Sequence, residues 1–190
     1  MTANRFDSKK LQKLNNPERL LDIPVDFMWD LLESVGAEVM VDIGAGTAFF
    51  SIAVLKHTGC STMYACDVSE TMITWIGENV VPEHPAIIPV KTEGVIVPLE
   101  DGIADVVFMI NLHHELDDPL SVMDEVFRIL RPGGKVLVVD WKKKDMDEGP
   151  PADIRYLPHV VEEQLTRNGF NTVFSTDELE KHFIVIGTKD

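Results

Sequence analysis

The sequence predicts an α/β protein whose β-sheet is covered by helices on both faces. Short runs of apolar and β-branched residues alternate along the chain with segments in which apolar residues recur at helical spacing, as expected for strands that alternate with helices. Several of these runs are too continuously apolar to have one face in water, so we expect them inside a sandwich of helices. Seven strands are expected, at residues 39–43, 61–66, 86–90, 104–110, 135–140, 170–175 and 183–187.

Capping residues and helix breakers mark the expected helices. Residues 16–18, Asn-Pro-Glu, combine an N-cap residue, a proline at the first helical position and an acid in the first turn, and residues 118–119, Asp-Pro, repeat the first two. The Arg-Pro-Gly-Gly segment at 131–134 is expected to end the helix after Pro119, before the next strand begins. Further helices are expected at residues 25–35, 48–56, 69–79 and 159–168, and a surface loop at 142–151.

Length, charge and cysteine content exclude several classes of protein. A chain of 190 residues fits one domain with a short appendage, and 45% hydrophobic residues are enough for a packed core. Its 17 basic and 32 acidic residues give a net charge of −15, which disfavours nucleic acid as a partner. Two cysteines without metal-finger spacing and a polar N-terminal segment predict a cytoplasmic protein with no disulfide framework, no bound metal and no membrane insertion.

A glycine-rich turn follows the first expected strand. Gly44 and Gly46 lie between that strand and a helix, where they permit a tight turn and let a ligand approach the backbone. Asp67 ends the next strand, 25 positions after Asp42, and an acid near that distance is suited to accept hydrogen bonds from both ribose hydroxyls of an adenosine cofactor. The alternatives are an ordinary strand-to-helix turn and an Asp67 that helps Ser69 to cap the following helix.

The turn does not fit a dinucleotide cofactor. The dinucleotide fingerprint needs a third glycine where this chain has Phe49. Asp42, just before the turn, is poorly placed beside a pyrophosphate but well suited to a cofactor that carries positive charge. The pattern therefore favours a cationic cofactor over NAD.

With these features the chain resembles the class I S-adenosylmethionine-dependent methyltransferases, and more closely the small methyltransferases similar to those of ubiquinone and menaquinone biosynthesis. The resemblance covers about residues 6–188. Asp42, Gly44 and Gly46 match the family's D-x-G-x-G-x-G turn, which holds the methionine half of the cofactor, and Ala48 replaces the last glycine.

Four further motifs follow in the family's order. Asp67 matches the ribose-binding acid and starts a D-x-S-x-x-M segment whose apolar positions flank adenine, while Glu93 matches the acid whose loop meets the adenine amino group. Residues 98–108 match the family's P-x-x-D-x-x-x-D-x-V-x segment, which leads into the fourth strand. Residues 130–135 match the family's L-R-P-G-G hairpin, which leads into the fifth. The resemblance assigns S-adenosylmethionine binding to Asp42, Gly44, Ala45, Gly46, Asp67, Val68, Met72, Glu93, Gly94 and Asn111.

The resemblance also implies the topology and the domain organisation. It implies a Rossmann-like sheet of seven strands in the order 3-2-1-4-5-7-6, mostly parallel, with the last strand antiparallel. Residues 1–35 would form N-terminal capping helices over the acceptor pocket, with residues 6–7 and 13–21 among them, and residues 36–190 would form the methyltransferase domain. In open sheets of this kind, ligands bind outside the carboxyl ends of the strands, where the strand order reverses.

The segment after the fourth strand supplies the candidates for acid-base chemistry. We expect His114 to accept a proton from the acceptor or to orient it, and the alternative is that His113 and His114 pack or cap the loop before Asp118. A metal site formed by the two histidines and Asp117 is disfavoured, because no further ligand cluster appears. The three lysines at 142–144 are interpreted as a solvated loop.

Three functions follow from this reading. The first is an S-adenosylmethionine-dependent methyltransferase that transfers a methyl group to a small-molecule acceptor by in-line displacement, which needs chiefly a positioned nucleophile and a site without water. The second is a non-catalytic S-adenosylmethionine-binding protein. The third, disfavoured by the turn, is a nucleotide-dependent oxidoreductase.

Overall fold

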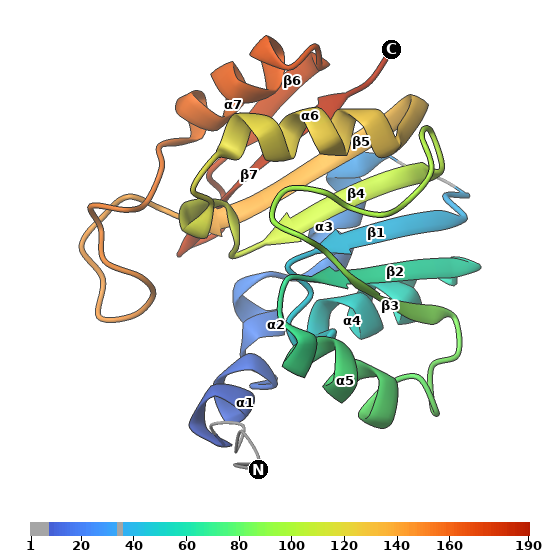
Figure 1. The fold of residues 1–190 in the computed structure, drawn as a ribbon. Coiled ribbons are helices and arrows are strands. Elements are labelled where there is room, and N and C mark those ends of the chain that lie inside the picture. The colour runs from blue at the N-terminus through green and yellow to red at the C-terminus, as the bar shows by residue number, and fades with distance from the viewer. Residues whose placement is uncertain (1–7, 34–35) are drawn as a thin grey trace.

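The protein is built around a sheet of seven strands, in the order β3-β2-β1-β4-β5-β7-β6 (Figure 1). The computed structural model describes residues 8–33 and 36–190. All neighbouring strands are parallel except at β7, which runs antiparallel to β5 and β6. The strands are β1 (Val39–Ile43), β2 (Thr62–Asp67), β3 (Ile87–Lys91), β4 (Ala104–Ile110), β5 (Leu130–Trp141), β6 (Asn171–Thr176) and β7 (His182–Thr188). The expected strand order and the antiparallel seventh strand are confirmed.

Helices cover both faces of this sheet, as the apolar strands predicted. The core on one face includes residues of α3, α4 and α5, and the core on the other includes residues of α6 and α7. The helices are α1 (Ser8–Leu14), α2 (Arg19–Asp22), α3 (Val25–Leu32), α4 (Phe49–Thr58), α5 (Glu70–Asn79), the 3-10 helix η1 (His113–Glu115), α6 (Pro119–Ile129) and α7 (Pro158–Arg167). Within the described ranges, no helix is both long and apolar enough to cross a membrane.

The helices that follow β2 and η1 begin where the capping residues predicted. The Ser69 hydroxyl accepts a hydrogen bond from the backbone N–H of Met72 at the start of α5. Asp118 accepts from the backbone N–H of Ser121 at 3.2 Å and from its hydroxyl at 2.6 Å at the start of α6. Each side chain accepts a hydrogen bond from a backbone N–H that has no partner within the first turn of the helix. These contacts determine the residue at which each helix begins.

The N-terminal helices differ from the prediction. Asn16 accepts a hydrogen bond from the N–H two residues later, at 3.1 Å, but the intervening residues form a turn and α2 begins only at Arg19. Helix α3 ends at Leu32, earlier than expected, because Glu33 adopts a left-handed conformation with φ 49°. Residues 6–7 and 34–35, expected to belong to helices, lie outside the described residues.

Strand β5 begins at Leu130, so the strand start predicted at residue 135 is wrong. Leu130 pairs with Ala104 and Lys135 pairs with Val106, which leaves the segment 131–134 as an irregularity within the strand. Gly133 has a φ of 78°, so the segment bulges out of the strand, and its glycines exchange backbone hydrogen bonds with Lys189, at 2.6 and 2.9 Å. Turn-forming residues are thus held in the sheet by the C-terminal end of the chain.

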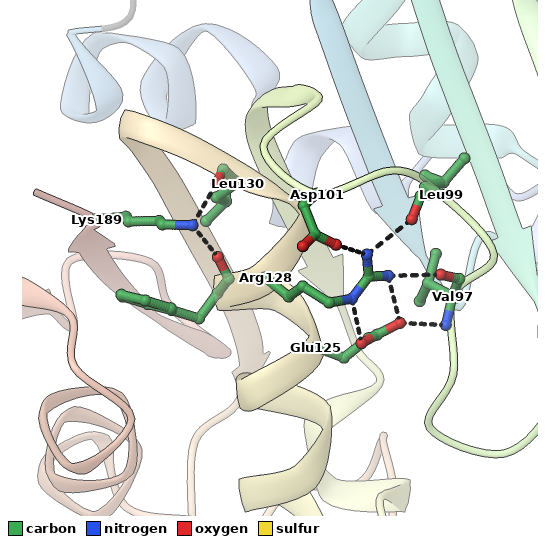
Figure 2. A network of polar contacts seen from close by, with 8 residues as sticks. Val97, Leu99, Asp101, Glu125, Arg128, Leu130 and Lys189 are labelled. Atoms are coloured by element: carbon green, nitrogen blue, oxygen red, sulfur yellow. Dashed lines mark hydrogen bonds and ion pairs between the residues drawn. The ribbon is translucent and has the colours of Figure 1, made fainter.

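Figure 2 shows how the loop between β3 and β4 is fixed to α6. The Arg128 guanidinium donates to the backbone carbonyls of Val97 and Leu99, and it pairs with Glu125 at 2.7 Å and with Asp101 at 2.5 Å. Glu125 in turn accepts from the backbone N–H of Val97 at 2.8 Å. These contacts hold in place a loop that would otherwise have few backbone partners.

Candidate functional site

A cleft of about 1010 Å³ opens at the carboxyl ends of the central strands. It is reached by α1 and α2, by the turn after β1, by the end of β2 and by the segment after β4. The predicted site residues that line it are Asp42, Gly44, Ala45, Gly46, Asp67, Val68, Met72, Gly94, Asn111 and His114. Glu93 is exposed and does not line the cleft, although its neighbours Thr92 and Gly94 do. The switch point in strand order therefore brings nearly all of the predicted residues together.

The glycine-rich turn is held by the end of β2. The N–H groups of Gly44 and Ala45 both donate to the Cys66 carbonyl, at 2.9 and 3.0 Å. Gly44 and Gly46 have φ angles of 76° and 56°, which favour glycine, and Ala48 takes a similar angle of 59° in place of the third glycine. A Cβ on Gly44 would lie 2.8 Å from the end of the Leu112 side chain, so a larger residue here would also force Leu112 to move.

Asp67 connects the glycine turn to α5. One carboxylate oxygen accepts from the Gly46 N–H and the other from the Ser69 N–H, each at 2.8 Å. The expected contribution to the helix start is thus present. Each oxygen keeps a second lone pair, and the residue lines the cleft. Asp67 therefore holds the turn together and still presents hydrogen-bond acceptors to a ligand.

Asp42 is a buried carboxylate at the base of the cleft. Its side chain accepts a hydrogen bond from the Ser51 hydroxyl at 2.6 Å, and the residue is 3% exposed. Its pKa is raised to about 7, chiefly by burial; the charge of Asp67 contributes to this increase, and the hydrogen bond from Ser51 acts in the opposite direction. A negative charge with so little compensation favours a cationic ligand.

Arg19, which the sequence analysis did not single out, is the nearby cation. Its positive charge lowers the pKa of Asp42, and its guanidinium lies over the rings of Phe49 and Phe50, 5.4 and 4.7 Å from their centroids. It also donates to the carbonyl of Leu14. The residue comes from α2, and only the tertiary fold places it against the turn after β1.

The charge of the lining agrees with a cationic ligand. Eight acidic and three basic side chains line the cleft.

Asn111 also lines the cleft, and its buried side-chain oxygen has no hydrogen-bond partner in the structure. Asn111 is held at a φ of 58°, and its N–H donates to the Val139 carbonyl at 2.8 Å. A buried oxygen without a donor favours a ligand that donates hydrogen bonds, as an ammonium group does. The residues present therefore fit S-adenosylmethionine, which has a sulfonium and an ammonium group.

His114 is held by a carboxylate from the neighbouring strand. Its Nδ1 lies 2.7 Å from Asp140 Oδ1, and its backbone N–H donates to Asp140 Oδ2 at 2.8 Å. Its Nε2 lies 3.7 Å from Glu115 Oε1. The sequence analysis did not identify Asp140 as a site residue. The position of Asp140 near the end of β5 could have indicated it, because side chains at this edge of the sheet converge on the cleft.

His113 has a different environment from His114. It is fully buried, and its Nε2 lies 2.8 Å from Gln164 Oε1. Its ring packs edge-on against Tyr156, with 4.9 Å between the ring centroids. Burial lowers its pKa. The packing role considered for both histidines therefore applies to His113, which is not among the cleft residues. In the described part of the chain, no group of three metal-binding side chains is close enough to hold an ion.

Residues of β5, β7 and the loop after β5 also line the cleft, and the sequence analysis did not single them out. Trp141 and His182 pair across β5 and β7, and their ring centroids are 4.3 Å apart. His182 is fully buried, neither ring nitrogen has a hydrogen-bond partner, and burial lowers its pKa to about 4. Lys181 pairs with Asp22 of α2 at 3.1 Å and with Glu148 at 2.8 Å. Glu148 belongs to the loop after β5, which Figure 1 shows projecting from the edge where β5 ends.

Comparisons with known proteins agree with this geometry. The family described as "Methyltransferase domain" matches residues 41–138. The ubiquinone/menaquinone biosynthesis C-methyltransferase UbiE of Roseobacter denitrificans is 25% identical over 120 residues, which are 61% of this chain and 47% of that protein. The chain thus spans less than half the length of that relative.

Solved structures extend the similarity to the whole fold. A SAM-dependent methyltransferase from Aquifex aeolicus is 28% identical with a TM-score of 0.84, covering 98% of this chain and 100% of that one. A type 11 methyltransferase structure from Sulfolobus solfataricus shares the fold at 23% identity and a TM-score of 0.71, covering 88% of this chain and 92% of that one. Because the family match spans more than half of the 190 residues, the chain belongs to the class I S-adenosylmethionine-dependent methyltransferases.

Proposed function

We propose that this protein transfers the methyl group of S-adenosylmethionine to a small-molecule acceptor by in-line displacement. The observation that carries the proposal is the cleft at the carboxyl ends of the strands, where the glycine turn, the buried carboxylate of Asp42 and His114 line one space. When bound, S-adenosylmethionine supplies a methyl group on a cationic sulfur. The protein's part in such a displacement is to position the two reactants and to exclude water.

The cofactor would be held chiefly by the turn after β1 and by the end of β2. Asp67 would accept hydrogen bonds from the ribose hydroxyls with the lone pairs that its two backbone contacts leave available. Val68, which is 62% exposed, and Met72 supply apolar surface for the adenine. Asp42 would attract the positively charged methionine half. His114 lines the same cleft and would be available to an acceptor bound there.

The N-terminal residues 1–35 would cap the acceptor side of the cleft. Lys13 and Leu14 of α1, and Arg19 and Leu21 of α2, line it, and Leu21 is 79% exposed. An exposed leucine beside an open cleft is available for contact with an apolar part of the acceptor. Residues 36–190 would form the catalytic domain.

Two measurements test the proposed function. Calorimetric titration should give saturable binding of S-adenosylmethionine and S-adenosylhomocysteine and no binding of NAD. A screen with labelled S-adenosylmethionine against quinol, phenol, amine and thiol acceptors should then give a methylated product. Cofactor binding without transfer to any acceptor would favour the non-catalytic binding protein, and saturable binding of NAD alone would refute the proposal.

His114 is the residue to test for proton transfer. If the acceptor loses a proton, His114→Ala should lower turnover about 10²- to 10⁴-fold while leaving S-adenosylmethionine affinity nearly unchanged, because general-base assistance acts in the transition state. The buried His113 provides a comparison, since a change there should lower thermal stability more than turnover. Normal turnover together with reduced stability in the His114 variant would show that this histidine has a packing role and does not transfer a proton.

A further inference from the structure

We propose that Asp140 and His114 form a dyad in which Asp140 fixes the imidazole tautomer, so that His114 Nε2 removes a proton from the nucleophilic atom of the acceptor. The inference rests on the proposed function and deepens it, because it names the acceptor class: compounds with a hydrogen on the nucleophilic atom, such as hydroxyl, thiol or protonated amine groups. Asp140 is a positioning residue here, because it acts through His114.

The position of Asp140 is fixed by three donors. It is 2% exposed, and the backbone N–H groups of His114 and Trp141 donate to its two oxygens at 2.8 and 2.7 Å. The third donor is the imidazole, at 2.7 Å. Because an ionised carboxylate is an acceptor only, its neighbour Nδ1 carries the hydrogen and the lone pair is left on Nε2.

Two carboxylates lie beside the imidazole of His114. Asp140 faces Nδ1, and Glu115 Oε1 lies 3.7 Å from Nε2. The side chain is 5% exposed and the residue lines the cleft, so an acceptor bound there would meet the imidazole with little competing water.

The proposed step balances in atoms and charge. The hydrogen of the acceptor moves to His114 Nε2, and the electron pair of that bond stays on the nucleophilic atom, which forms a bond to the methyl carbon. The carbon–sulfur bond of S-adenosylmethionine breaks with its electrons on sulfur, which gives S-adenosylhomocysteine. The imidazolium of His114 then returns the proton to water. An acceptor without such a hydrogen would not need the dyad.

Asp140→Ala tests the positioning role. The substitution removes the carboxylate that accepts from Nδ1. Without this acceptor the imidazole hydrogen is no longer held on Nδ1 and can move to Nε2, the atom that must take up the proton. Nitrogen-15 NMR of the histidines should show Nδ1–H in the wild type and a shift towards Nε2–H in the variant, with turnover reduced about 10²- to 10⁴-fold.

Asp105→Ala is the matched control. Asp105 is also a buried aspartate that accepts two backbone N–H groups, from Glu38 and Val39 at 2.8 and 2.7 Å, but it lies outside the cleft. This variant should lose stability without any change in the His114 tautomer. An unchanged tautomer in Asp140→Ala, or the same tautomer shift in both variants, would overturn the proposal.

A set of acceptor probes tests the acceptor class. Hydroquinone, 2-mercaptoethanol and ethanolamine have a hydrogen on the nucleophilic atom, whereas pyridine and dimethyl sulfide do not. Methyl transfer confined to the first group and lost in Asp140→Ala is expected. Undiminished transfer to the first group in Asp140→Ala would refute the dyad, and transfer to pyridine or dimethyl sulfide would refute the acceptor class. Absence of transfer to every probe would count against the proposed function and the acceptor class together, while the NMR result still decides the dyad.

Discussion

The buried carboxylate of Asp42 makes a sharp prediction about pH. Its pKa is raised from 3.8 to about 7, so the folded protein holds this proton more tightly than the unfolded chain does. The contribution of Asp42 to stability is therefore greatest below its unfolded pKa and is lost as the pH rises from about 4 to about 7. This trend is opposite to that of an aspartate in an ion pair.

The size of the effect follows from the shift. A change of about three pH units, at about 1.4 kcal/mol for each, gives an upper limit of about 4 kcal/mol for the cost of the ionised side chain at neutral pH. Asp42→Asn removes the charge while its amide oxygen still accepts the hydrogen bond from Ser51. We expect the variant to gain about 1 to 4 kcal/mol in free energy of unfolding at pH 8, and little or none at pH 4.

Two assays check the prediction. Urea unfolding across pH 4 to 8 should show the slope in the wild type and its loss in Asp42→Asn. Ser51→Ala, which removes the hydrogen bond that favours the ionised form, should extend the slope to higher pH. Calorimetry near pH 6 in buffers of different ionisation enthalpy should show proton release when S-adenosylmethionine binds, because a cation favours the ionised carboxylate. Equal pH profiles for wild type and Asp42→Asn would refute the reasoning.

Three further predictions concern the turn, the ribose site and the network of Figure 2. Asp67→Asn should weaken S-adenosylmethionine binding about 10- to 150-fold in calorimetry, the equivalent of about 1.5 to 3 kcal/mol for a charged hydrogen bond, and unchanged affinity in a folded variant would leave Asp67 with its capping contact alone. Gly44→Ala should lower the melting temperature more than Gly46→Ala, because its Cβ would lie 2.8 Å from Leu112 whereas the nearest atom at the other position is 3.7 Å away; equal losses would mean that conformation alone decides. Arg128→Met should reduce the free energy of unfolding by about 1 to 3 kcal/mol, measured in urea, and a change below 0.5 kcal/mol, roughly the size of a surface substitution, would show that the contacts drawn in Figure 2 are not stabilising.

The fold was predictable because local sequence and burial agree along most of the chain. The strands at 39–43 and 104–110 were predicted with their observed bounds, and the strand order followed from the resemblance. The start of β5 was not predictable, since the Arg-Pro-Gly-Gly segment at 131–134 has the composition of a turn. Its place in the sheet depends on hydrogen bonds to Lys189, a residue more than fifty positions away.

The sequence by itself determined that the residues at the ends of β1 and β2 line the cleft. Asp42 and Asp67 end neighbouring parallel strands, so their place at one edge of the sheet follows from strand assignments and order. Tertiary structure alone decided the other contacts: that Arg19 of α2 lies near Asp42, and that Asp140 of β5 holds His114. Those contacts join segments whose separation in the sequence carries no signal, and they depend on how whole elements pack. The same reason explains why two adjacent histidines, alike in the sequence, have different environments.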